Sequence, residues 1–152
     1  MSVQLNQAIS IEDKVRVQVG NMYDLKFASV WVTNADGEID CVAQSSDVYD
    51  LLDDKKTFKA IKDYDTFSIL TCGWASPLES TDENTPPSQH PQKRRVRLLV
   101  HATEFGVASV LRFKDDGDEI VTDDGAATGS LAETVMELMD KKMTNMMKKE
   151  NK

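Results

Sequence analysis

A cluster of positive charge is the most unusual feature of this chain. Four of the five residues from 93 to 97 are basic, and they follow a proline-rich stretch that contains His90. Alternate residues of a strand share a face, so we expect Arg95 and Arg97 to project together. Neighbouring guanidinium groups bind phosphate or carboxylate through paired hydrogen bonds. With Trp74 at the end of the preceding strand, these residues predict a site for a small anionic ligand or an acidic protein partner.

A structural role is the competing interpretation of the same charges. Under it, Lys93, Arg95 and Arg97 neutralise acidic loops nearby or protect a sheet edge from pairing with another strand. Nucleic acid is a weaker alternative, because the chain has 18 basic and 26 acidic residues and a formal net charge of −8. A field of that sign repels polyanions and anionic membrane surfaces.

Two cysteines and two histidines raise the alternative of a hydrolase or a metal-dependent enzyme. Cys41, Cys72, His90 and His101 match the ligand number of a zinc site, but they are scattered singly instead of forming close pairs. A catalytic Cys–His pair needs a partly exposed Cys72 beside one of the histidines. A small buried thiol is the competing interpretation. We therefore expect no metal, no cofactor and no catalytic residue.

The acidic runs and the missing motifs favour a binding module over an enzyme. Residues 115–119 and 123–124 lack the alternating ligands and the final glutamate of a calcium-binding EF-hand loop. Their composition is that of a solvated hairpin tip. The chain contains no glycine-rich phosphate loop, no Gly-x-Ser-x-Gly and no His-Glu-x-x-His sequence.

Methionine is concentrated in the last predicted helix. Five of the seven methionines lie between residues 136 and 147, and Met-rich faces are typical of adaptable binding surfaces. Core packing explains the first part of this stripe. Over residues 141–152 methionine and lysine alternate, which predicts either a tail that frays or a basic amphipathic end that docks on an acidic partner. A structural protein that assembles through this helix is a third alternative.

The strands that must position these groups form a mainly antiparallel sheet. Apolar and β-branched segments, with an Asp-Gly turn between the first two, predict strands. They cover residues 27–33, 38–43, 66–72, 94–102 and 107–113, and a strand-like triplet follows at 120–122.

Apolar residues at helical spacing predict two or three helices. A helix that starts at Ser10 is favoured over a strand for residues 10–25. Residues 47–62 form one helix or two short ones, and the last helix is capped by Ser130 and Glu133. The fold class is therefore α+β, with a sheet of about five strands and helices on one face, a shape shared by profilin-like and PAS-like domains.

Length and composition describe one ordinary globular domain over residues 1–152. Hydrophobic residues make up 40% and charged residues 29% of the 152 positions, enough to bury a core. We expect residues 75–92 to form a long mobile loop.

Two cysteines are too few for a disulfide framework, and neither a signal peptide nor a membrane-spanning apolar segment is present. We expect a cytoplasmic protein with no membrane contact.

Three short segments resemble a pattern found in uncharacterised, chiefly actinobacterial proteins. They are Gly-Trp-Ala-Ser-Pro-Leu at 73–78, Pro-Pro-Ser-Gln-His-Pro at 86–91 and Arg-Arg-Val-Arg at 94–97. The resemblance spans about residues 66–138 and implies a bacterial protein, without an activity or catalytic residues attached. It also implies that the loop and the arginines form one recurrent unit.

The expected function is thus that of a small, acidic, non-catalytic binding module. Its site is predicted to consist of Trp74, His90, Arg95 and Arg97. Convergence of these side chains on one surface would favour the site, and dispersion would favour structural roles.

Overall fold

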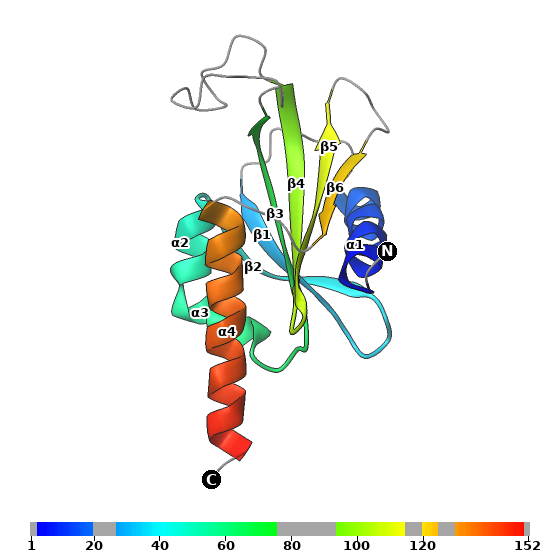
Figure 1. Cartoon of the computed structure of the whole chain (residues 1–152). Helices are drawn as coiled ribbons and strands as arrows, with labels where there is room; N and C mark the ends of the chain where they lie inside the picture. Colours follow the sequence, from blue (N-terminus) through cyan, green and yellow to red (C-terminus); the bar gives the residue numbers. More distant parts are fainter. Residues whose placement is uncertain (1–2, 20–26, 76–93, 115–119, 125–129, 151–152) are drawn as a thin grey trace.

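The computed structural model describes residues 3–19, 27–75, 94–114, 120–124 and 130–150. In these ranges the chain forms six strands and four helices (Figure 1). In chain order the elements are α1 (Val3–Val19), β1 (Ala28–Thr33), β2 (Ile39–Ser45), α2 (Val48–Asp53), α3 (Lys55–Ile61), β3 (Phe67–Ala75), β4 (Arg94–Thr103), β5 (Gly106–Phe113), β6 (Ile120–Asp124) and α4 (Ser130–Glu150).

All six strands belong to one antiparallel sheet, in the order β2-β1-β3-β4-β5-β6. The predicted α+β class with a single domain is confirmed, and the sixth strand arises because the triplet at 120–122 extends into β6 and pairs with β5. The predicted hairpin joins β1 to β2. Gly37 supplies its positive φ of 80°. The Asn34 side chain closes this turn by accepting hydrogen bonds from the backbone N–H groups of Asp36 and Glu38.

Helices cover both faces of the sheet, so the expectation that they lie on one face is wrong. α1 packs on one face, and α2, α3 and α4 lie together on the other (Figure 1). Side chains alternate along each strand, so β4 contributes Leu99 to the core under α1 and Val100 to the core under α4. Each face of the sheet is therefore buried.

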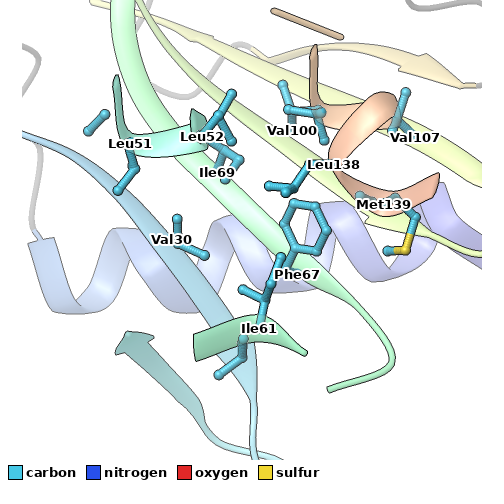
Figure 2. Packing of buried hydrophobic residues seen from close by; sticks show 14 residues of the cluster. Val30, Leu51, Leu52, Ile61, Phe67, Ile69, Val100, Val107, Leu138 and Met139 are labelled. Carbon is cyan, nitrogen blue, oxygen red and sulfur yellow. The ribbon is translucent and has the colours of Figure 1, made fainter. Parts of the chain in front are cut away.

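The core between the sheet and α2–α4 is the larger of the two. Phe67 and Ile69 from β3 and Val100 from β4 lie close to Leu138 of α4 (Figure 2). The core on the opposite face packs Val15 and other α1 residues against β1, β3, β4 and β5. Burial on this scale supplies the main stabilisation of a domain of this size.

α1 begins at Val3, well before the predicted start at Ser10. Leu5 and Ala8 are buried and recur at helical spacing with Val15, so the apolar stripe extends further toward the N-terminus than the prediction assumed. The helical interpretation is right as far as Val19, and residues 20–25 lie outside the described part. α1 contacts β4 and β5, which carry arginines.

The remaining helices follow the predicted positions closely. Residues 47–62 form the two short helices α2 and α3, capped by the side chains of Asp47 and Asp54. α4 begins at the predicted Ser130 and continues to Glu150, with Lys142 buried and Met143 half-buried. No helix in the described ranges is both long and apolar enough to cross a membrane.

Candidate functional site

The predicted arginines lie on an interior strand of the sheet. β4 pairs with β3 on one side and with β5 on the other, so the explanation that these charges protect an open edge is wrong. Arg95 and Arg97 share the face of Leu99, as the strand period predicts. Arg97 is only 2% exposed, whereas Arg95 is half-buried. Arg97 is buried because α1 covers this face of the sheet.

Glu12 of α1 is the partner that allows Arg97 to be buried. The Glu12 carboxylate accepts two hydrogen bonds of 2.8 Å from Arg112, one from Nε and one from Nη2. Arg97 Nη2 lies 3.7 Å from Glu12 Oε1. Arg97 and Arg112 are paired across β4 and β5, so one carboxylate on α1 holds two neighbouring guanidinium groups of the sheet. A bidentate pair of this kind is strong and fixes geometry.

The arginines of the chain are confined to the helix and the two strands that form this contact. Arg16 lies one helical turn after Glu12, and its Nη2 is 3.0 Å from Asp13 Oδ1. β4 carries Arg94, Arg95 and Arg97, and β5 carries Arg112, so all five arginines of the chain lie on α1, β4 and β5. In an acidic protein, this region therefore concentrates the groups that bind anions best.

Arg95 lies where β4 begins, beside the end of β3. Its Nη2 donates to Cys72 Sγ at 3.5 Å, and Cys72 is half-buried. The antiparallel register places Trp74 directly opposite Arg95 in the backbone. The structure thus brings two of the four predicted residues to neighbouring positions on adjacent strands. His90 lies outside the described residues, as does Lys93, and the predicted loop at 75–92 falls there except for Ala75, the last residue of β3.

A second polar group lies further along the same face. His101 is fully buried, with Nδ1 2.8 Å from Ser68 Oγ and Nε2 2.9 Å from Gln7 Oε1. In the tautomer with its proton on Nε2, the ring donates to Gln7 and accepts from the Ser68 hydroxyl. Burial lowers the pKa of His101 from 6.5 to about 4. The imidazole is therefore neutral at pH 7.

These residues do not form the catalytic pair considered for an enzyme. Cys72 is opposite Arg97 and Ser68 is opposite His101, so Cys72 lies four strand positions, roughly 13 Å, from the histidine. Ser68 and His101 are within the distance of a nucleophile and its base, but they are 1% and 0% exposed. No group of three or more His, Cys, Asp or Glu side chains in the described part of the chain is arranged to hold a metal ion.

Sequence reasoning missed Glu12 and Arg112, although each left a signal. Glu12 lies four residues after Ala8 and three before Val15, on the buried stripe of α1. Arg112 follows Ala108 and Val110 at the two-residue period of β5. A charged residue at an apolar position on both elements indicates a buried ion pair, because a charge is rarely buried without a partner.

No protein-family model, no curated protein and no solved structure matches this chain. The predicted resemblances to profilin-like and PAS-like domains and to actinobacterial proteins therefore stay predictions.

Proposed function

We propose that the protein is a non-catalytic binding module that takes an anionic group, a phosphate or a carboxylate, beside Arg95 at the start of β4. The observation that carries this proposal is that all five arginines of an acidic chain lie on α1, β4 and β5. Arg95 is the more exposed of the two predicted arginines that the structure describes on β4.

The buried ion pairs that Glu12 forms with Arg97 and Arg112, here called the buried network, support the proposal because they hold two guanidinium groups in place near Arg95. Two strand positions separate Arg95 from Arg97, roughly 7 Å. Glu12 keeps Arg97 and Arg112 in a fixed arrangement. An anion at Arg95 would lie near guanidinium charge that needs no further ordering, and such preorganisation favours binding. The attraction between an anion and these guanidinium charges is also stronger near a protein interior than in bulk water, because the effective dielectric constant is lower there.

The neighbouring segment supplies the other members of the proposed site. Lys93 immediately precedes β4, and His90 precedes it by four residues. Trp74 is opposite Arg95 in the sheet register. An acidic protein segment or a small phosphorylated or carboxylated molecule carries the charge that this set would recognise.

Two other functions predicted from the sequence remain alternatives. A hydrolase or metal-dependent enzyme would have to use His90 with other groups, because Cys72 and His101 are separated along the sheet. A structural component would assemble through the methionine-rich helix α4 and would use the buried arginines only to attach α1. The structural alternative predicts that anions leave Arg95 unaffected, whereas the enzyme alternative predicts a stoichiometric metal ion or a reactive Cys72 thiol.

The test is a calorimetric titration of the full chain with inorganic phosphate and with pyrophosphate. We expect saturable binding, tighter for pyrophosphate, that weakens at least about tenfold in Arg95→Gln, the loss expected for one charged hydrogen-bonding partner. Lys55→Gln, a change of the same charge at an exposed position on α3, is the matched control. Equal affinities in Arg95→Gln and in the unchanged protein, or no binding of either anion, would overturn the proposal.

A further inference from the structure

A small groove separates α4 from the turn between β4 and β5. Its volume is about 200 Å³. Phe105 lines it from the turn, and Met136, Met139 and Met143 line it from α4. Met136 and Met143 are half-buried, and Met139 is buried. The methionine stripe singled out in the sequence therefore does more than fill the core, because part of it faces an open groove.

The turn holds Phe105 in an exposed position. The Thr103 hydroxyl accepts a hydrogen bond from the Phe105 N–H at 3.1 Å and donates one to the Gly106 carbonyl at 3.1 Å. Gly106 has a φ of 137°, a conformation that other residues rarely adopt. With this support Phe105 remains 76% exposed. A large aromatic side chain fixed outside the core is typical of an interaction surface.

Two carboxylates flank the apolar lining. Glu104 on the turn and Asp140 on α4 line the groove and are exposed. An apolar surface with an acidic rim is complementary to a segment that combines apolar and basic side chains. Methionine suits such a surface because its flexible, polarizable side chain adapts to different apolar partners.

The size and position of the groove narrow the choice of ligand. A volume of about 200 Å³ is below the ~300–1,000 Å³ of typical small-molecule sites, so it suits one or two side chains of a larger partner. β4 and β5 are each paired on both sides. An added strand therefore finds no free backbone edge here, and recognition has to use side chains.

We propose that this groove is the docking site for a cationic amphipathic helix of a protein partner. Apolar side chains of that helix enter between Phe105 and Met143, and its lysine or arginine side chains face Glu104 and Asp140. This docking site is independent of the proposed anion site. None of the arginines lines the groove, and the partner is cationic instead of anionic.

The experiment measures fluorescence anisotropy of a labelled helical peptide of leucine and lysine, with leucine at the i, i+3, i+4 and i+7 positions. We expect saturable binding that weakens about tenfold or more in Phe105→Ser, the loss typical of a central aromatic contact. Asp140→Asn and Glu104→Gln should each weaken binding and reduce its dependence on salt. Circular dichroism should show the same fold for all three variants, because the substituted side chains are exposed.

The controls separate this docking site from general attraction to an acidic protein. Glu133→Gln removes an exposed acidic charge from α4 outside the groove lining and should leave the affinity unchanged. A peptide of leucine and glutamate in the same pattern should not bind. The proposal is wrong if Glu133→Gln weakens binding as much as Asp140→Asn, or if Phe105→Ser binds normally. It is also wrong if sedimentation shows a dimer that Phe105→Ser dissociates, because a second copy then occupies the groove.

Discussion

Acid should destabilise this protein through His101 over a defined range of pH. The folded state holds the pKa of this imidazole at about 4, against 6.5 for a solvated histidine. Below pH 6.5, His101 therefore becomes protonated in the unfolded chain but stays neutral in the folded chain. The free energy of unfolding consequently falls as the pH drops. The loss is complete near pH 4, where the folded state also becomes protonated. Each pKa unit corresponds to about 1.4 kcal/mol, so the total loss is about 3 kcal/mol.

The assay compares urea unfolding of the unchanged protein with that of His101→Gln at several pH values. Glutamine cannot titrate, and other groups that titrate in both proteins cancel in the difference. The variant is expected to be less stable at pH 7, because it loses part of the contact with Ser68 and Gln7. Its disadvantage should shrink by about 3 kcal/mol between pH 6.5 and pH 4. A difference that stays constant between pH 6.5 and pH 4 would show that His101 does not cause the loss of stability in acid.

Three further outcomes test other parts of the structure. Glu12→Ala should lower the free energy of unfolding by about 3–5 kcal/mol in a denaturant titration, because it leaves two buried arginines without their carboxylate; a loss below 1 kcal/mol would contradict the buried network. Cys41 is exposed and Cys72 half-buried, so peptide mapping after brief treatment with a thiol reagent should show label mainly on Cys41, and equal labelling would contradict the burial. Gly37→Ala should cost about 1 kcal/mol in thermal unfolding because of the positive φ, and an unchanged midpoint would contradict the turn geometry.

Local patterns were sufficient to predict most of the elements. The Asp-Gly turn and its flanking alternation predicted the β1–β2 hairpin, and Ser130 with Glu133 predicted the start of α4. Both signals are short-range, since a turn needs one positive φ and a helix start needs a cap. β6 was underestimated because a short strand is stabilised by its pairing with β5 more than by its own composition.

The arrangement of the helices could not be derived from the same patterns. Period-two alternation reveals that a strand has two faces, but not which face a distant helix covers. The environment of Arg97 depends on Glu12, which is 85 positions earlier in the chain. The face shared by Arg95 and Arg97 was predictable from the strand period, whereas the burial of Arg97 followed only from the position of α1.

The anion site is tested most directly by an NMR titration that detects the arginine side chains while pyrophosphate is added. If pyrophosphate binds at Arg95, the Nε–H resonance of Arg95 should shift first and saturate. Arg112, which is 6% exposed and bound to Glu12, should shift much less. Shifts confined to lysine side chains elsewhere, or an Arg95 resonance that stays in place at saturating pyrophosphate, would contradict binding of the anion at Arg95.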